Sequence, residues 1–266
     1  MKIGVVSDVH LEFGRGGLVI EKLPYLVLAG DVVVADLRTM SKGIRAMYQE
    51  RYMNFFEECS KNCGNVIYIA GNHEFYHGDI NEVHDHIRLL LDGFPNIHFL
   101  DNESKAFPND GISFFGSTFW TDFKDFNPLI VQQCKDSMSD YYVIRNGDKT
   151  LMPMDVYEIN QSARDCLFEY LESPLSQHKQ IVVTHHAPSY ASVERQYATD
   201  DLSYAYVNTG LDKMLLDGNG PNVWIHVHIH AQNDYMHGNT RVISNPRGYV
   251  GRESGAEQRQ LKIIEV

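Results

Sequence analysis

Short apolar runs that end in polar residues recur along the chain and predict buried β-strands. The run KIGVV is followed by SDVH, and the run YLVLAG is followed by Asp31. A third run, NVIYIAGNH, repeats this form. Runs of this length that are rich in β-branched residues and end at turn-forming residues are typical of strands buried on both faces. Each strand is therefore expected to bring polar residues to its carboxyl end.

Longer stretches between these runs predict helices. Residues 40–59, which are rich in Met, Arg, Glu and Phe, predict a helix between the second and third strands. Residues 80–91 predict another before the strand NIHFL. The alternation predicts an α/β protein with its functional site at the carboxyl ends of the strands. No linker rich in Gly, Ser or Pro interrupts it, so we expect a single domain over residues 1–266. The later elements are ISFFGSTFW, a helix over 156–171, QIVVTHHAPS, NVWIHVHIH, TRVISNPRGY and QLKIIEV.

Histidines and acidic or amide residues gather at five of these strand ends. One Asp after a strand is often only a turn residue or helix cap, and one His is usually structural. Five such ends together favour a metal centre, because carboxylate, amide oxygen and imidazole suit Mn, Fe or Zn better than metals that prefer thiolates. Within the last strand, alternate positions are expected to face one way. The residues are Asp8 and His10, Asp31, Asn72 and His73, His185 and His186, and His226, His228 and His230.

The number of candidate ligands favours two ions. A single catalytic ion seldom takes more than about six ligands while it keeps a place for water, and an aspartate can bridge two ions with its carboxylate. Two ions about 3.5 to 4 Å apart promote in-line displacement at phosphorus. The pattern therefore predicts phosphoester chemistry.

The motifs DVH, GD, GNHE, THH and HxH, in this order, resemble the five-block signature of the calcineurin-like metallophosphoesterase superfamily. The resemblance extends from Asp8 to His230, and the runs GSTFWTDF and NPRGY are similar to those of small bacterial members. It implies a four-layer α/β/β/α sandwich of two mixed sheets with helices outside. It also implies that His73 protonates the leaving group or stabilises the transition state. The implied ligands are Asp8, His10, Asp31 and His230 for the first ion, and Asp31, Asn72, His185 and His228 for the second.

One position departs from the family pattern, because Val227 stands where the family usually has Gly before the last HxH pair. We expect an ordinary extended strand that keeps both ligands, since β-branched residues suit strands. The alternative is a shifted strand end and a weakened second ion. His226, one step deeper on the ligand face, is expected to make structural hydrogen bonds.

The expected activity is metal-dependent hydrolysis of a phosphomonoester or phosphodiester, nucleotides included. A hydroxide that bridges the two ions attacks phosphorus in line with the ester oxygen, and His73 donates a proton to the leaving group. Mn, Fe, Zn and Co all accept this ligand set. Arg247 is a candidate to bind a phosphate oxygen, with a surface position or packing on Tyr249 as the alternative. His186 is a candidate to contact substrate.

Two other functions stay open: a nuclease of the same fold, and a catalytically inactive scaffold. The net charge is −12 and no cluster of Lys and Arg occurs, so nucleic acid is an unexpected partner and a small phosphoester is favoured. An inactive scaffold should have lost several ligands, and all seven are present. No apolar run is long enough for a membrane span or a signal peptide, so we expect a cytoplasmic protein without membrane contact.

The sequence also carries expectations for the walls of the substrate pocket and for the cysteines. Residues 12–24, 75–80, 121–155 and 189–206 are expected to form the walls of the substrate pocket. The four cysteines show no CxxC spacing and are expected to be free thiols, mostly buried. Aromatic residues in or beside 121–155 would either stack on a base or belong to the core; they are Trp120, Phe123, Phe126, Tyr141 and Tyr142.

Overall fold

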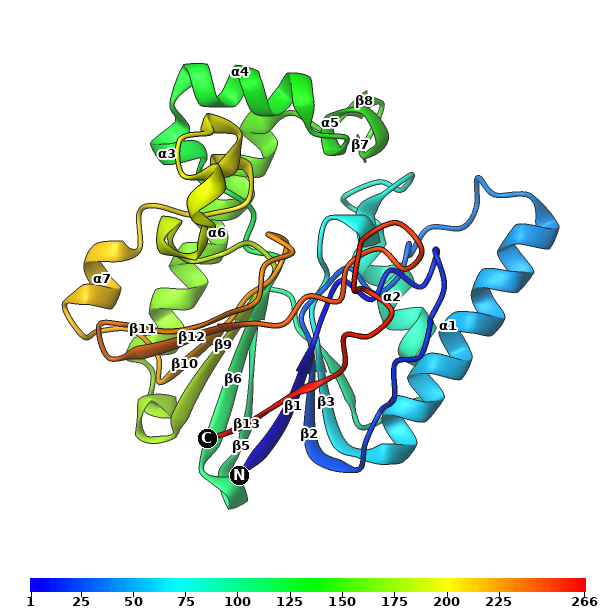
Figure 1. Cartoon of the computed structure of the whole chain (residues 1–266), viewed down its shortest axis with the longest axis horizontal. Coiled ribbons are helices and arrows are strands. Elements are labelled where there is room, and N and C mark those ends of the chain that lie inside the picture. The colour runs from blue at the N-terminus through cyan, green and yellow to red at the C-terminus, as the bar shows by residue number, and fades with distance from the viewer.

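The computed structural model describes residues 1–266 and has two β-sheets that pack face to face, with helices on both outer sides (Figure 1). The first sheet contains β1 (Lys2–Val6), β2 (Leu23–Leu28), β3 (Cys63–Tyr68), β4 (Ile97–Phe99) and β13 (Lys262–Glu265). Its order is β13-β1-β2-β3-β4, in which β1 to β4 are parallel and β13 is antiparallel to β1. The sheet is therefore mixed.

The second sheet is also mixed. It contains β5 (Glu103–Phe107), β6 (Ile112–Ser117), β9 (Lys179–Thr184), β10 (Val223–Ile225), β11 (Asn233–His237) and β12 (Thr240–Ser244). Its order is β11-β12-β10-β9-β6-β5, with a parallel centre of β12, β10, β9 and β6 and an antiparallel strand at each edge. The first sheet's parallel strands and this parallel centre present their carboxyl ends at the same end of the molecule.

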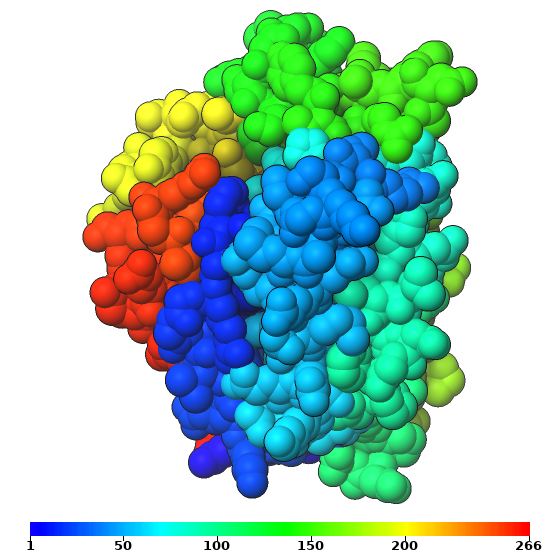
Figure 2. All heavy atoms as spheres, turned by 90° about the vertical axis from the view of Figure 1, so that its right-hand side faces the viewer, coloured from blue at the N-terminus to red at the C-terminus, as the bar shows by residue number.

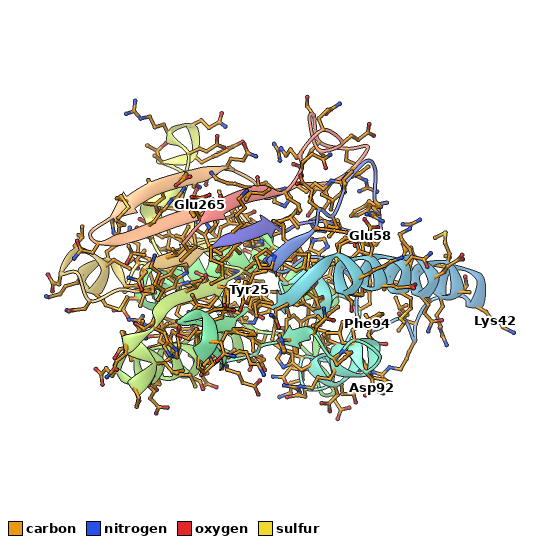
Figure 3. The ribbon with its side chains drawn as sticks, turned by 90° about the horizontal axis from the view of Figure 1, so that it is seen from below. Tyr25, Lys42, Glu58, Asp92, Phe94 and Glu265 are labelled. Carbon is orange, nitrogen blue, oxygen red and sulfur yellow. The ribbon has the colours of Figure 1, made fainter.

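Alternating side chains on the central strands explain how the sheets are buried on both faces. Ile181 and Val183 of β9 belong to the apolar layer between the sheets, whereas Val182 between them packs into the layer under the outer helices. Tyr25 of β2 lies in the middle of the molecule (Figure 3), with its ring centroid 5.0 Å from Phe107 and 5.8 Å from Phe114 of the other sheet. Strands with two apolar faces need cover on both sides, and this requirement produces the four layers.

The outer layers are formed by helices with one buried stripe each. In α1 (Lys42–Asn62) the buried residues follow helical spacing, at Tyr52, Phe55, Phe56 and Cys59. α1 and α2 (Val83–Leu91) pack on the first sheet, and α6 (Pro153–Glu172) and α7 (Asp212–Leu216) pack on the second. The predicted four-layer α/β/β/α sandwich is confirmed. The prediction of one domain over the whole chain stays a prediction.

Residues 123–150 lie across the top of the two sheets in Figure 1. Trp120, Phe123 and Tyr141 are buried in the apolar core, Phe126 is half-buried against it, and Tyr142 is exposed. Most of these aromatic residues therefore belong to the core, which was the alternative to stacking on a base. The elements are α3 (Phe123–Phe126), α4 (Pro128–Ser137), α5 (Asp140–Val143) and a short hairpin of β7 (Arg145–Asn146) and β8 (Lys149–Thr150).

The segment before β2 runs beside the residues before β13, although the two are far apart in sequence (Figure 2). Gln260 connects them, because its side-chain amide donates to the Gly17 carbonyl at 3.0 Å and accepts from the Val19 N–H at 3.1 Å. The chain ends also meet, with the Met1 amine donating to the Val266 carbonyl at 2.8 Å.

Most predicted elements are present, but the strand that contains the alternating histidines is shorter than predicted. β10 ends at Ile225, before the first of them. Three of the four cysteines are buried, Cys166 is half-buried, and all are free, as predicted. None of the helices combines the length and the apolar character needed to cross a membrane.

Candidate metal centre and cavity

The seven predicted ligands come together at the carboxyl ends of the parallel strands. Asp8 follows β1, Asp31 follows β2 and Asn72 follows β3 of the first sheet, while His185 follows β9 and His228 follows β10 of the second. Because both sheets present these ends on one side, side chains from two layers meet between them. His230 is partly exposed, with 20% of its side chain accessible, and the other six are buried.

Five of these residues have positive φ, which is uncommon for residues other than glycine. The φ angles are 47° at Asp8, 47° at His10, 52° at Asp31, 67° at His228 and 56° at His230. Such conformations cost about 1 to 3 kcal/mol each and persist only where the surrounding structure holds them. The chain therefore turns at the ligands instead of continuing as extended strand.

The prediction that the last three histidines point one way along a strand is wrong. The N–H of Ile229 donates to the Val227 carbonyl at 2.8 Å, which closes a tight turn around His228. His226, before the turn, points away from the ligands, and its Nε2 lies 2.8 Å from Ser192 Oγ. Its structural hydrogen bond is as expected. Val227 is 1% exposed and belongs to the apolar layer between the sheets.

Side chains of the first predicted ligand set form one compact cluster. Ligand atoms of Asp8, His10 and His230 all lie within 4.8 Å of one another. His230 Nε2 is 3.2 Å from Asp8 Oδ1, and His10 Nε2 is 3.7 Å from Asp31 Oδ2. Donors bound at about 2.0 to 2.2 Å from one ion lie about 3 to 3.5 Å apart, so these separations are close to those of a shared ion.

The second set forms a neighbouring cluster that shares Asp31 with the first. Ligand atoms of Asp31, His185 and His228 lie within 4.8 Å of one another. His185 Nε2 is 3.5 Å from Asp31 Oδ2 and 3.1 Å from Asn72 Oδ1. Asp31 Oδ2 therefore lies between imidazole nitrogens of both predicted sets, which is the position that a bridging carboxylate requires.

Two glycines permit this close approach. A Cβ at Gly30 would lie 2.6 Å from His185 Nδ1, and a Cβ at Gly71 would lie 2.2 Å from Asp31 Oδ1. Neither distance is possible for a side-chain carbon, so the glycines of the GD and GNHE motifs leave the space that the ligands occupy.

Acceptors behind three of the histidines orient their rings. His10 Nδ1 lies 3.2 Å from Glu12 Oε1, His185 Nδ1 lies 3.2 Å from the Ala29 carbonyl, and His230 Nδ1 lies 2.7 Å from Glu253 Oε1. A proton on each Nδ1 leaves each Nε2 as the free donor atom, which is the arrangement found behind metal-bound histidines.

Two of the ring nitrogens that face the clusters are buried without a hydrogen bond. They are His10 Nε2 in the first cluster and His228 Nε2 in the second. A buried nitrogen without a partner costs free energy, so such atoms call for an explanation. An ion at each cluster would supply the missing partner, and the residues present therefore fit two metal ions.

His73 lies beside the first cluster and is held from both sides. Its Nδ1 is 3.1 Å from Glu12 Oε1, and its Nε2 is 3.2 Å from the hydroxyl of Tyr249. Its backbone N–H donates to Asp31 Oδ1 at 2.8 Å. One carboxylate, that of Glu12, thus orients both His73 and the predicted ligand His10.

The buried charges shift the pKa values of these groups. Burial alone would raise the pKa of Glu12, but hydrogen bonds from His10 and His73 lower it to about 2. Burial lowers the pKa of His73, but Asp31 and Glu12 outweigh it and raise the pKa above the ordinary value. Burial likewise opposes the charge on His230, and Asp8 raises its pKa to about 10. A metal ion at the first cluster would have to displace that proton.

Arg247 and His186, the two candidates for contact with substrate, do not line the cavity. Arg247 is fully buried, and its guanidinium donates to the backbone carbonyls of Ala256 and Arg15. His186 is also buried, with its ring 5.4 Å from that of Trp120 and its Nδ1 3.3 Å from the Thr118 carbonyl. Both side chains bond to backbone carbonyls around the site, and Arg247 is not exposed at the surface.

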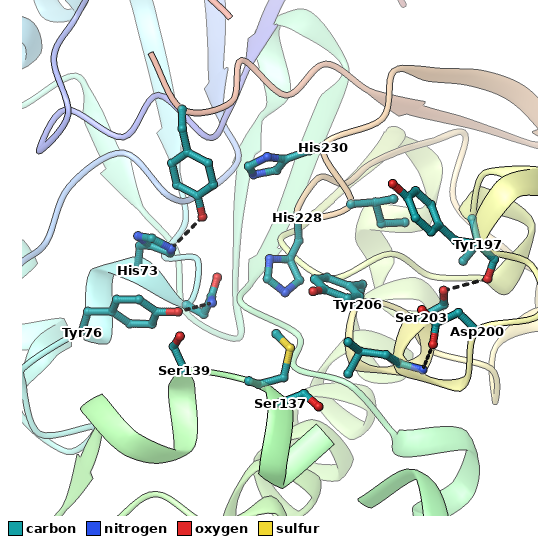
Figure 4. A pocket seen from close by; sticks show the side chains of 16 residues that line it. His73, Tyr76, Ser137, Ser139, Tyr197, Asp200, Ser203, Tyr206, His228 and His230 are labelled. Carbon is teal, nitrogen blue, oxygen red and sulfur yellow. Dashed lines mark hydrogen bonds between the residues drawn. The ribbon is translucent and has the colours of Figure 1, made fainter. Parts of the chain in front are cut away.

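A cavity of about 490 Å³ opens beside the two clusters (Figure 4). This volume suits a small organic ligand. Asn72, His73, His228 and His230 form its wall on the side of the clusters. Three of the four predicted loop segments contribute to the rest, and residues 12–24 do not. The other lining residues are Tyr76, Ser137, Met138, Ser139, Val193, Tyr197, Asp200, Leu202, Ser203, Tyr206, Ile229 and Tyr249.

Sequence reasoning missed the residues that support the predicted ligands. Glu12 lies two positions after His10, so the spacing in DVHLE carried a signal that was not used. Asp140 is buried and accepts a hydrogen bond from the Asn72 amide at 2.8 Å. Tyr249 ends the NPRGY run, but nothing in that run indicates a contact with His73, and Glu253 and Asp140 come from segments that no local pattern marks.

A family model described as calcineurin-like phosphoesterase matches residues 1–232. An uncharacterized protein of Acanthamoeba polyphaga mimivirus is 26% identical over 273 residues, which cover 92% of this chain and 90% of the viral protein.

Solved structures with a similar fold share little sequence with the chain. The phosphopantetheinyl hydrolase of Mycobacterium tuberculosis superposes with a TM-score of 0.68 at 13% identity, over 99% of this chain and 95% of that chain. A putative 5′-nucleotidase of Staphylococcus aureus superposes with a TM-score of 0.50 at 15% identity, over 91% of this chain and 48% of the nucleotidase. At these identities the likeness shows the fold alone.

Proposed function

Since the chain belongs to the calcineurin-like phosphoesterase family, we propose that it hydrolyses a small-molecule phosphoester with two metal ions bound at the clusters described above. The first ion would be held by Asp8, His10, Asp31 and His230. The second would be held by Asp31, Asn72, His185 and His228. The names of the two structural neighbours, a phosphopantetheinyl hydrolase and a putative 5′-nucleotidase, are consistent with this reaction class.

The position of Asp31 Oδ2 carries this proposal. It lies 3.7 Å from His10 Nε2 and 3.5 Å from His185 Nε2, and these nitrogens belong to different ligand sets. Each cluster also contains a buried imidazole nitrogen without a hydrogen bond, that of His10 in the first and that of His228 in the second. Carboxylate, amide and imidazole donors suit Mn, Fe and Zn.

The chain's own residues supply the proton and the orientation. Two bound ions would make a nucleophilic water available near neutral pH and would neutralise charge on the phosphoryl oxygens. His73 lines the cavity, and the Glu12 carboxylate 3.1 Å from its Nδ1 favours the protonated ring that a general acid needs. Glu12 holds Nδ1 of that ring, so Nε2 faces the cavity and donates the proton to the leaving oxygen. Tyr249 contacts Nε2 and holds the ring in place until substrate arrives.

Val227 is not expected to weaken the binding of the proposed second ion. Its side chain fills the layer between the sheets, and the tight turn that follows directs His228 to the cluster. The inactive scaffold is disfavoured by the complete ligand set. A nuclease is disfavoured because the cavity lining includes no Lys or Arg, whereas a groove for a nucleic-acid backbone is basic.

Metal analysis and hydrolysis assays on one protein preparation test the proposal. The protein is loaded separately with Mn, Fe, Zn or Co, its bound metal is counted, and hydrolysis of nitrophenyl phosphate and of bis-nitrophenyl phosphate is measured. We expect two ions per chain and turnover of at least one ester. Asp31→Asn removes the shared carboxylate, so we expect loss of metal from both clusters and loss of turnover.

His178→Ala is the matched control. His178 directly precedes β9, and His185 directly follows it, so the two histidines lie at opposite ends of one strand, about 20 Å apart. The control should keep both ions and full turnover. One ion per chain in fully loaded protein would overturn the dinuclear centre, and two ions without turnover of any ester would favour the inactive scaffold.

A further inference from the structure

The cavity wall away from the clusters has no cationic side chain. Among its sixteen lining residues there is no Lys and no Arg, and the one carboxylate is that of Asp200. Oδ1 of Asp200 accepts a hydrogen bond from the Leu202 N–H at 2.9 Å, and the residue is exposed, so Oδ2 is free to accept from a ligand. Beyond the reach of the proposed ions, the wall offers a carboxylate to a donor group and no cation to a second anion.

Two tyrosines give the cavity aromatic walls next to the site histidines. The Tyr76 ring is stacked on His73, with centroids 4.2 Å apart and planes inclined by 23°. The Tyr206 ring lies 4.7 Å from that of His228. Figure 4 shows these rings projecting on two sides of the cavity, close to the histidines. Met138, Leu202 and Ile229 add apolar surface.

We propose that the cavity selects phosphoesters whose organic group is flat or apolar, carries no negative charge, and presents a hydrogen-bond donor to Asp200. The ester phosphate lies at the clusters, and the organic group lies against Tyr206 and Tyr76. This inference rests on the proposed function. It excludes nucleoside diphosphates and triphosphates, because their further phosphates would face Asp200 and uncharged walls without a cation.

The charge of the chain agrees with this selection. The net charge of −12 gives the protein a field that repels polyanions as they approach. A neutral or cationic organic group meets no such repulsion, and a cationic group gains contacts with the faces of the tyrosine rings.

A pair of esters with the same shape and different charge tests the inference. Meta-carbamoylphenyl phosphate and meta-carboxyphenyl phosphate differ by one negative charge far from phosphorus. We expect kcat/KM to be about tenfold higher for the carbamoyl ester, since a like charge a few ångströms from a partly solvated carboxylate is disfavoured to that extent. Asp200→Asn should reduce this ratio to about two.

Binding gives a second readout that needs no turnover. The corresponding meta-carbamoyl- and meta-carboxybenzylphosphonates are not hydrolysed, and calorimetric titration of the manganese-loaded protein should show about tenfold tighter binding of the carbamoyl compound. Tyr206→Leu should weaken the carbamoylbenzyl compound about tenfold, because an aromatic wall is lost, and should leave inorganic phosphate binding within twofold.

The outcomes separate this inference from the proposed function. Equal kcat/KM and equal affinity for the charged and neutral members of each pair would overturn the charge selection, while turnover itself would still support the phosphoesterase. Preference for the carboxylate member would also overturn it. Absence of turnover with every ester in metal-loaded protein would instead overturn the proposed function.

Discussion

Glu74 is the residue whose replacement should disturb the centre most without removing a predicted ligand. Its buried carboxylate accepts five hydrogen bonds. Oε2 accepts from the N–H groups of Asp31 at 2.9 Å and Gly71 at 2.7 Å. Oε1 accepts from two further backbone N–H groups at 2.7 and 3.1 Å and from the Tyr68 hydroxyl at 2.8 Å. One side chain thus connects the loops after β2 and β3.

Glu74→Gln keeps the shape and removes one acceptor. The amide nitrogen must take the place of one oxygen, and either choice leaves two backbone N–H groups facing another donor, since the Tyr68 hydroxyl at Oε1 can turn to accept. A buried donor without a partner costs about 1 to 3 kcal/mol, so two cost about 2 to 6 kcal/mol. Burial raises the pKa of Glu74, and the variant is relieved of that buried charge, which offsets part of the cost. We expect the free energy of unfolding to fall by about 3 kcal/mol.

Urea unfolding measures this effect. A chelator is present because bound ions would add their own stabilisation to the folded state. Glu57→Gln, an exposed position on α1, is the control and should change the free energy by less than about 0.5 kcal/mol. A Glu74→Gln protein as stable as the control would refute the reasoning. A second readout is manganese affinity, which should drop about 10- to 100-fold because Asp31 loses its support.

Three further predictions concern the histidines and Val227. His73→Ala should slow an alkyl phosphoester about 100- to 10,000-fold and a nitrophenyl ester far less, since a good leaving group needs no acid; equal slowing would contradict the acid role. Val227→Gly, which introduces the residue usual in the family, should lower the free energy of unfolding by about 2 to 4 kcal/mol by emptying the layer between the sheets; unchanged stability would show that this layer repacks. Burial lowers the pKa of His226 to about 4, below its ordinary value near 6.5, so its stabilisation is present above pH 6.5 and is lost as the pH falls toward 4. Between pH 7 and pH 5, the free energy of unfolding of the metal-free wild type should therefore fall by about 2 kcal/mol more than that of His226→Gln. An equal fall in the two proteins, measured by urea unfolding at both pH values, would contradict this.

Most strands and helices could be predicted because each is indicated by a local pattern of apolar and polar residues. Strands such as β9 contain adjacent apolar residues, here Ile181 to Val183, which indicates burial on both faces, and the stripe of α1 has the spacing of a helix. β5 was missed because its residues, ESKAF, are mostly exposed and polar at an edge of the sheet. The segment 121–155 gave no clear pattern, since its helices are short and its aromatic residues serve the core below it.

The residues of the candidate site could be predicted from the sequence, but the orientation of their side chains could be predicted only in part. Alternation along a strand predicted that His226 would face the same way as His228 and His230. Positive φ at the latter two residues breaks that alternation, and such angles depend on hydrogen bonds to other strands. The burial of Arg247 could not be predicted for a related reason, because its guanidinium donates to the Ala256 carbonyl 9 residues away and to the Arg15 carbonyl 232 residues away.

The sequence by itself determined which strands are buried, the order of the motifs, and the residue types that end each strand, because these depend on composition and spacing within about ten residues. The tertiary structure alone decided which donor atoms meet. Glu12 and Tyr249 contact His73 across 61 and 176 residues of sequence, and Glu253 reaches His230 from a loop without a motif. Contacts over such separations require the two sheets to pack and the chain to turn at each ligand, and no local pattern of apolar and polar residues encodes either event.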